Sequence, residues 1–276
     1  MIIVGLSNSK SLAKKIAHKL NVDYEDLQTR KDNELHLRFH SNIKDQKVVL
    51  VQSLYPDTNH ALFEVLYAAS AARDLGAKEI VYVAPYLGFL REDIRDMEGE
   101  CVNLHVLADL LNRNVDSLIS VEPHLHQHSL AKNLFSIPFY KINATELFRD
   151  YAKKNFKDHK IIAVSERGKI LAKHLDNNAE LHEKIKRRGN VRVNLSFDYD
   201  GKKVVIFDDI IHTGKTMKET LRNLKAKEVN LMSVHGLFNN ISLKDNVKDI
   251  ITSNTVENKN SKIDVSGIIA GKLMEI

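Results

Sequence analysis

The sequence predicts an α/β protein with two domains and mainly parallel sheets. Short apolar runs alternate along the whole chain with segments of helical period, which is the pattern of strand–helix–strand units. The length of 276 residues exceeds that of one ordinary domain and suits two. A composition of 43% hydrophobic and 28% charged residues supplies apolar material for two cores and argues against disorder.

The expected elements follow in chain order from this alternation. The apolar runs expected to form buried strands are Ile2–Gly5, Val48–Gln52, Ile80–Ala84, Ser117–Val121, Ile161–Val164, Val204–Phe207 and Val229–Val234. The segments with helical spacing are Ser9–Leu20, Asn59–Leu75, Val102–Asn112 and Met217–Lys225. The four prolines and eleven glycines are scattered, so no linker marks a domain boundary.

An internal repeat supplies that boundary. KVVLVQS, which begins at Lys47, and KVVIFDD, which begins at Lys203, are each followed by a helical segment and a second strand. Ala-Lys-Glu precedes the second strand in both copies. A three-residue match arises easily by chance, so the shared order of elements carries the argument. We expect a duplicated domain joined near residues 136–146, which gives domains at 1–140 and 141–276.

Charge and cysteine content limit the partners and the compartment. Lysine plus arginine outnumber aspartate plus glutamate by 41 to 36, which suits an anionic partner such as a phosphorylated metabolite or RNA. The basic residues form no continuous stripe with interleaved aromatics, so we expect no nucleic-acid partner. The single cysteine, Cys101, excludes a disulfide framework and a cysteine-based zinc site. Without a long apolar stretch or signal-peptide pattern, the prediction is a cytoplasmic protein with no membrane partner.

The segment VVIFDDIIHTGKT, from Val204 to Thr216, carries the sharpest chemical signal. An apolar strand leads to the carboxylates Asp208 and Asp209, and a Thr-Gly-Lys-Thr turn then opens a helix. Ligands of parallel sheets bind beyond the carboxyl ends of the strands, and a helix N-terminus offers free N–H groups to an anion. An N-cap after acidic loop residues would explain one aspartate or one threonine, but not the ordered set. We therefore expect a site for a phosphate and a sugar.

This segment resembles the loop of type I phosphoribosyltransferases that binds 5-phosphoribosyl 1-diphosphate (PRPP). Five further stretches resemble the ribose-phosphate diphosphokinases, or PRPP synthases: APYLGFLREDIRD from Ala84, SVEPH from Ser120, KRRGNV from Lys186, and SVHGLF and SNTVE near the C-terminus. The short length and Glu98-Gly99-Glu100 are similar to archaeal-type members. The resemblance implies two tandem type I phosphoribosyltransferase-like domains. The first domain would bind nucleotide and the second ribose 5-phosphate. The last helix of the chain could pack against the N-terminal domain.

The activity that the resemblance implies is transfer of diphosphate from Mg-ATP to the anomeric hydroxyl of ribose 5-phosphate, giving PRPP and AMP. Mg²⁺ is the implied cofactor, ATP and ribose 5-phosphate are the partners, and a homo-oligomer is expected. Two alternatives stay open. A phosphoribosyltransferase that consumes PRPP is disfavoured by Arg91 and His124. A non-catalytic relative that regulates an active homologue is favoured by the altered segment Val164–Ile170.

The resemblance assigns the ribose phosphate to one continuous segment, consisting of Asp208, Asp209, His212, Thr213, Gly214, Lys215 and Thr216. It assigns catalysis to Lys186 and Arg188. Attack on the β-phosphorus develops negative charge on the transferred oxygens and on the leaving AMP, so cations must converge there. The basic run Glu183–Arg192 with Gly189 suits a loop that closes over substrate, and a solvated basic turn is the alternative.

Nucleotide binding is assigned by the same resemblance to Asp32, Glu34, Arg91, Glu92 and His124. The guanidinium of Arg91 suits bidentate capture of a phosphate. Glu92 stands where glutamine is usual in the family. Asp32 and Glu34 match an acidic hairpin that reaches adenine across a subunit contact.

The implied metal ligands are His124, Glu166 and Asp208. In VSERGKI the family has an aspartate followed by glycines, whereas this chain has Glu166, Arg167 and Lys169, which reverse the local charge. EPHLHQH also raises the idea of a zinc site, since alternate residues of a strand share one face. The chain has thirteen histidines, however, so a local cluster arises readily.

Overall fold

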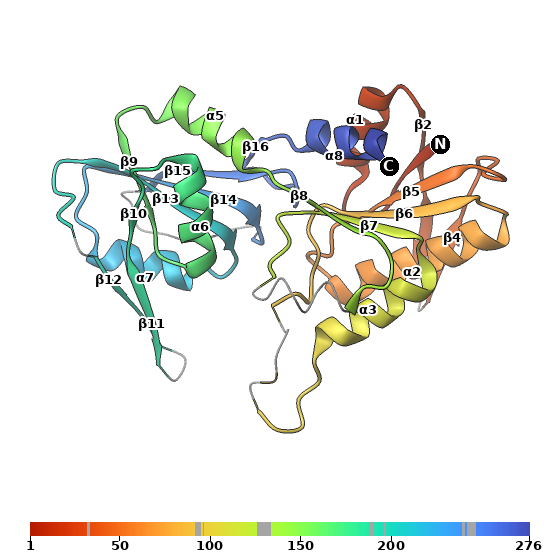
Figure 1. The fold of residues 1–276 in the computed structure, drawn as a ribbon, viewed down its shortest axis with the longest axis horizontal. Helices are drawn as coiled ribbons and strands as arrows, with labels where there is room; N and C mark the ends of the chain where they lie inside the picture. The colour runs from red at the N-terminus through yellow and green to blue at the C-terminus, as the bar shows by residue number, and fades with distance from the viewer. Residues whose placement is uncertain are drawn as a thin grey trace. The chain divides into compact units, whose positions relative to one another are not determined.

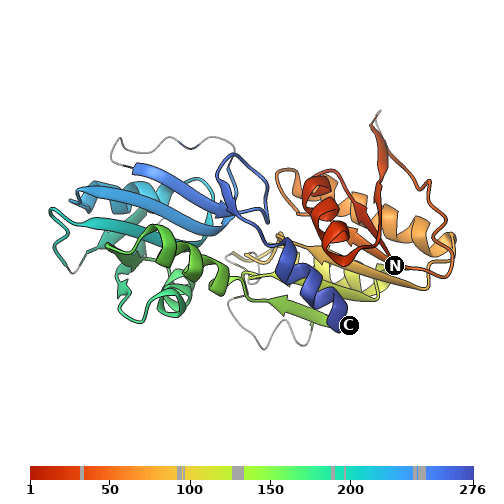
Figure 2. The same cartoon turned by 90° about the horizontal axis from the view of Figure 1, so that it is seen from above.

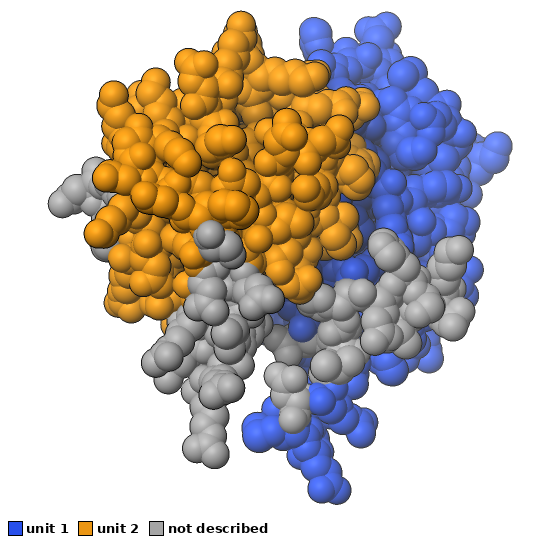
Figure 3. Space-filling view, turned by 60° about the vertical axis from the view of Figure 1, so that its left-hand side comes forward, with its two compact units in different colours: residues 1–142, 266–276 blue, residues 143–265 orange. Residues whose placement is uncertain are grey.

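The protein is described by a computed structural model, which covers residues 1–31, 34–91, 95, 97–125, 134–187, 190–195, 197–238, 241 and 247–276. The chain forms two compact units, coloured separately in Figure 3. Unit 1 consists of Met1–Ile142 and Ser266–Ile276, and unit 2 consists of Asn143–Val265. None of the helices in these described ranges is long and apolar enough to span a membrane.

Each unit is built on a six-stranded sheet in which every neighbouring pair of strands is parallel. The order in unit 1 is β2 (Asp23–Asp26), β1 (Ile2–Gly5), β5 (Lys47–Val51), β6 (Glu79–Ala84), β7 (Ser117–Val121) and β8 (Phe139–Ile142). The order in unit 2 is β10 (Glu180–Leu181), β9 (His159–Ala163), β13 (Lys203–Ile211), β14 (Glu228–Gly236), β15 (Val247–Ser253) and β16 (Ser261–Ile263). The predicted α/β class with parallel sheets is confirmed (Figure 1).

The two sheets match position by position. The strands that begin with the repeated KVV sequence, β5 and β13, are each third in their sheet. Lys47 lies opposite Glu79 in the next strand of its sheet, and Lys203 lies opposite Glu228. These glutamates are the last residues of the two Ala-Lys-Glu copies. The repeat seen in the sequence therefore marks the same place in two similar sheets.

Helices cover the buried strands of unit 1 on both faces. Figure 1 shows α1 (Lys10–Leu20) and α8 (Ser266–Glu275) on one side of the sheet, and α2 (Thr58–Asp74) and α3 (Asn103–Asn114) on the other. Helix α8 packs against α1, and both helices can be followed in the turned view of Figure 2. Lys47 Nζ donates to the backbone oxygen of Ile276 at 3.1 Å. Strands enclosed on both faces must be apolar throughout, which explains the unbroken runs of Val, Ile and Leu in the sequence.

Unit 2 adds α5 (Thr145–Asn155), α6 (Glu166–Leu175) and α7 (Lys215–Asn223) to its sheet. An antiparallel hairpin, β11 (Glu183–Arg187) with β12 (Asn190–Asn194), is inserted between β10 and β13. Unit 1 carries the hairpin of β3 (Gln28–Lys31) with β4 (Leu35–Arg38). The basic segment expected as a loop therefore forms paired strands over most of its length.

Strand β13 is longer than the sequence predicted. We expected the strand to end at Phe207, but its pairing with β14 continues through Asp208, opposite Ser233, as far as Ile211, opposite Gly236. Aspartate is a poor strand former, so the apolar pattern alone stops too early. The structure corrects the position of the carboxylate pair, which lies within the strand and not after it.

Candidate functional site

The centre of the candidate site is the aspartate pair on β13. Asp208 and Asp209 are 4% and 3% exposed, although they are charged residues near the carboxyl edge of the sheet. Asp208 Oδ1 accepts hydrogen bonds from the Ser165 hydroxyl and from the backbone N–H of Asp209, the latter at 2.9 Å. Burial of a carboxylate is costly unless donors surround it, so these contacts fix one oxygen of Asp208 in place.

Ser165 joins the aspartate to the start of α6. Its hydroxyl accepts a hydrogen bond from the Gly168 N–H at 2.8 Å, which caps the helix, and donates its own proton to Asp208. A Cβ on Gly168 would lie 2.7 Å from Ser165 Oγ and 3.0 Å from Asp208 Oδ1. Glycine is therefore required for α6 to approach the strand this closely. Sequence reasoning missed Ser165, because a helix-capping pattern shows the cap and not its long-range partner.

The turn after β13 leads directly into α7. Gly214 is the N-cap residue, has φ of +71°, and gives the helix no side-chain cap. A left-handed φ at this place favours glycine. His212, Thr213 and Lys215 are exposed at the turn, and Thr216 is half-buried. The helix end is positively polarised, and its first N–H group, that of Lys215, donates to Thr213 Oγ1 at 3.4 Å.

Glu166 lies apart from this arrangement. It is the first residue of α6, its side chain is 85% exposed, and it accepts a hydrogen bond from Lys169 Nζ at 2.7 Å. The hydroxyl of Ser165, and not the Glu166 carboxylate, meets Asp208. Among the residues that the structure describes, no group of three or more His, Cys, Asp or Glu side chains could hold a metal ion. A metal role for Glu166 stays a prediction.

Unit 1 holds the residues predicted to bind nucleotide. Arg91 is exposed at the end of a turn anchored by Leu87 and Leu90, which are both buried. Phe89 in that turn has φ of +64°. His124 is half-buried in the segment after β7, and Glu34 is exposed just before β4. Asp32, Glu92 and Arg188 lie outside the described residues, as do His126 and His128, and only the backbone of Lys186, within β11, is described.

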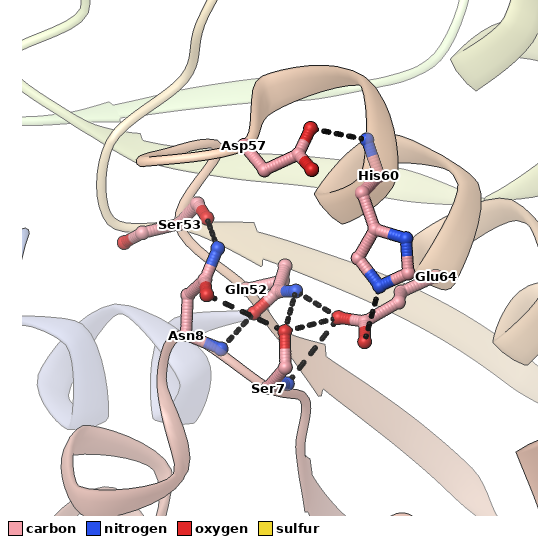
Figure 4. A network of polar contacts seen from close by, with 7 residues as sticks. All are labelled: Ser7, Asn8, Gln52, Ser53, Asp57, His60 and Glu64. Carbon is pink, nitrogen blue, oxygen red and sulfur yellow. Dashed lines mark hydrogen bonds and ion pairs between the residues drawn. The ribbon is translucent and has the colours of Figure 1, made fainter. Parts of the chain in front are cut away.

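A second polar network lies at the carboxyl edge of the unit 1 sheet, where β5 ends (Figure 4). Glu64 of α2 is completely buried, and its Oε2 accepts hydrogen bonds from Ser7 Oγ, from Ser7 N at 3.4 Å and from Gln52 Nε2. His60 Nε2 lies 3.3 Å from Glu64 Oε1. Asn8 N donates to Gln52 Oε1 at 2.9 Å. Sequence reasoning missed this network, for which the one signal is a glutamate on the apolar side of a helix.

Comparison with known proteins places the chain in a family. Residues 1–114 match the N-terminal domain of ribose phosphate pyrophosphokinase, and residues 131–266 match the phosphoribosyl transferase domain. The ribose-phosphate pyrophosphokinase of Thermoplasma acidophilum is 30% identical over 99% of both chains. That of Saccharolobus solfataricus is 32% identical over 98% of this chain and 99% of its own.

The chain belongs to the ribose-phosphate pyrophosphokinase family. A solved structure agrees on the fold: phosphoribosylpyrophosphate synthetase from Mycobacterium smegmatis is 23% identical, with a TM-score of 0.82 over 99% of this chain and 97% of that one. The predicted pair of phosphoribosyltransferase-like domains is confirmed. Asp208, Asp209 and Gly214 lie within the residues that match the phosphoribosyl transferase domain.

Proposed function

We infer that the protein transfers diphosphate from Mg-ATP to ribose 5-phosphate, giving PRPP and AMP. The observation that carries the inference is the buried pair Asp208 and Asp209, followed in the same segment by the uncapped Gly214 turn. A carboxylate pair accepts hydrogen bonds from two sugar hydroxyls, and an open helix N-terminus binds a phosphate. The family of the chain supports the same reaction.

Ribose 5-phosphate is proposed to occupy the segment from β13 to α7. The 5-phosphate would accept hydrogen bonds from backbone N–H groups of Thr213–Thr216, with the two threonine hydroxyls as further donors. His212 and Lys215, which are exposed at the same turn, would add positive charge. Asp208 and Asp209 would then hold the ribose hydroxyls.

The donor set at β13 fits Mg²⁺. This ion keeps several waters and takes one or two protein carboxylates together with substrate phosphates, so it needs no closed cage of protein ligands. Asp208 is the proposed carboxylate, since Ser165 and the Asp209 N–H orient it. His124 is proposed to act with the nucleotide phosphates, and Glu166 would join only by leaving Lys169. When bound, Mg²⁺ would neutralise charge on the phosphates.

The chemical step is a transfer of a diphosphoryl group. The anomeric hydroxyl of ribose 5-phosphate gives up its proton to water as its oxygen forms a bond to the β-phosphorus of ATP. The bond from that phosphorus to the bridging α,β-oxygen breaks, and AMP leaves with that oxygen. Lys186 and Arg188 are proposed to stabilise the charge that develops. Arg91 and His124 are proposed to orient the ATP phosphates, Glu92 to stand beside them, and Asp32 with Glu34 to contact adenine. We also propose that the protein works in the cytoplasm as a homo-oligomer.

The test is an assay of AMP release from ATP and Mg²⁺ with and without ribose 5-phosphate. We expect AMP only when the sugar phosphate is present, together with an equal amount of PRPP seen by ³¹P NMR. One observation favours the regulatory alternative, namely that Glu166 is paired with Lys169 at the start of α6. A protein that binds ATP but never forms PRPP would establish that alternative.

A further inference from the structure

Two buried side chains, His182 and Tyr199, and the half-buried Glu180 join the two ends of the hairpin β11–β12. His182 immediately precedes β11, and Tyr199 lies between β12 and β13. His182 Nε2 is 2.5 Å from the Tyr199 hydroxyl, and that hydroxyl donates to Glu180 Oε2 at 2.5 Å. His182 is fully buried and Tyr199 is 2% exposed.

The number of protons available decides which atoms donate in the two hydrogen bonds between His182, Tyr199 and Glu180. A phenol carries one proton, and Tyr199 gives it to Glu180. His182 Nε2 must therefore carry a proton of its own and donate it to the tyrosine oxygen. Burial lowers the pKa of His182 and raises the pKa of Tyr199, so the ring is neutral and the phenol protonated near pH 7. The hydrogen bonds run from His182 through Tyr199 to the Glu180 carboxylate.

The base of the hairpin is also attached to its surroundings on each side. The backbone N–H of His182 donates to the Ala163 carbonyl at 2.9 Å, which ties β11 to the end of β9. Strand β12 packs against α7, and Asn223 Nδ2 of that helix donates to the Val193 carbonyl at 3.4 Å. Helix α7 is the one that begins at the Gly214 turn. The hairpin is thus fixed at its base to the element proposed to bind the 5-phosphate.

We propose that His182, Tyr199 and Glu180 form a clasp that positions the hairpin for diphosphoryl transfer. They are positioning residues, since they would act through Lys186 and Arg188, and the proposal rests on the function proposed above. A hydrogen bond accepted by a carboxylate is about twice as strong as one between neutral groups. Loss of the phenol hydroxyl therefore loosens the base of the hairpin. In that case the substrates, whose proposed binding residues lie outside the hairpin, keep their affinity, whereas the catalytic cations of the hairpin lose their orientation.

The test compares Tyr199→Phe with Tyr151→Phe, which removes the hydroxyl of a half-buried tyrosine in α5 of the same unit. Amide hydrogen exchange is measured over residues 183–194 without substrates, and kcat and KM are measured for AMP formation. We expect Tyr199→Phe to speed exchange of the hairpin about tenfold and to lower kcat about tenfold, with both KM values changed less than about twofold. Tyr151→Phe should change none of these. Unchanged hairpin exchange in folded Tyr199→Phe overturns the clasp.

A second variant guards against failure to fold. Glu180 has a partly exposed side chain, so Glu180→Gln, which keeps an acceptor for the phenol, and Glu180→Ala, which removes it, should both fold. We expect faster hairpin exchange and a lower kcat in Glu180→Ala. In Glu180→Gln, both the exchange rate and kcat should lie close to those of the unaltered protein. Equal behaviour of the two variants overturns the clasp. If the unaltered protein forms no AMP, the proposed function fails while the exchange measurement still decides whether the clasp exists.

Discussion

The carboxyl edges of the two sheets carry polar clusters at equivalent points with opposite character. In unit 1, Asp57 caps α2 by accepting from the His60 N–H at 3.1 Å, and Glu64 fills the space beside Ser7. In unit 2, the helix in the same position starts at Gly214 without a side-chain cap. A carboxylate caps the helix after β5, whereas the first N–H of the helix after β13 meets a neutral hydroxyl, that of Thr213.

The serines show how a common fold was adapted in the two places. Ser7 follows β1 and Ser165 follows β9, which are the equivalent neighbours of β5 and β13. Ser7 gives its proton to a helix residue, Glu64, and Ser165 gives its proton to a strand residue, Asp208. A carboxylate enclosed by donors of its own chain serves stability. A carboxylate pair beside an open helix end is suited to a ligand.

The largest effect that tests this contrast is expected from Asp209→Ala. Loss of a carboxylate that holds a sugar hydroxyl should abolish turnover or raise the apparent KM for ribose 5-phosphate, because the attacking hydroxyl loses its orientation. The matched control is Ser53→Ala, at the corresponding position of the KVVLVQS copy. We expect the control to keep its kinetic constants within about twofold. Unchanged kinetics in Asp209→Ala would remove the aspartate from the mechanism.

Lys186→Ala should give the next largest change. A cation that acts on the transition state in a closed site is worth about 3 to 4 kcal/mol by analogy with an oxyanion donor, or roughly two to three decades in rate. We expect kcat to fall by that amount while the nucleotide dissociation constant, measured by calorimetry, stays nearly unchanged. If binding weakens and kcat holds, the hairpin is a binding element.

Glu64→Ala tests the other side of the comparison. It leaves Ser7 N, Ser7 Oγ and Gln52 Nε2 without their buried acceptor, which should cost about 2 to 4 kcal/mol of unfolding free energy. We expect a lower urea midpoint, and an unchanged KM for ribose 5-phosphate in the folded protein. A variant of full stability with no activity would show that the unit 1 network is part of the active site.

The sequence predicted the alternation of strands and helices and pointed to the β13–α7 segment, because both depend on local patterns. KVVIFDD and the glycine turn are consecutive in the chain, so their residues could be read together. The contacts of Ser165, Glu64 and His182 could not be predicted, since each joins residues brought together only by folding. Two further differences have the same origin: β14 extends β13 past its apolar run, and the basic segment finds a hairpin partner.

The smallest effect concerns the amino edges of the sheets, where the two Ala-Lys-Glu copies end. Glu79 forms an ion pair with Lys47 at 3.3 Å, and its side chain is 39% exposed. Glu228 accepts hydrogen bonds from Lys248 Nζ at 2.9 Å and from Asn230 Nδ2 at 3.1 Å, and lies 3.0 Å from His159 Nε2. Lys248 above all, with His159 and Asn230, lowers the pKa of Glu228 to about 2.

This difference predicts an acid dependence that only unit 2 should show. A carboxyl with pKa about 2 in the folded state and 4.5 as its ordinary value contributes stability above about pH 4.5, and that contribution is lost as the pH falls toward about 2. Glu228→Gln should therefore lower the free energy of unfolding at pH 7, measured by urea denaturation, by about 1 kcal/mol after allowance for solvent screening. The difference from the unaltered protein should shrink between about pH 4.5 and pH 3, while Glu79→Gln shows a much smaller difference at every pH. A Glu228→Gln difference that is independent of pH would mean that packing, and not the charge of the carboxylate, stabilises this edge.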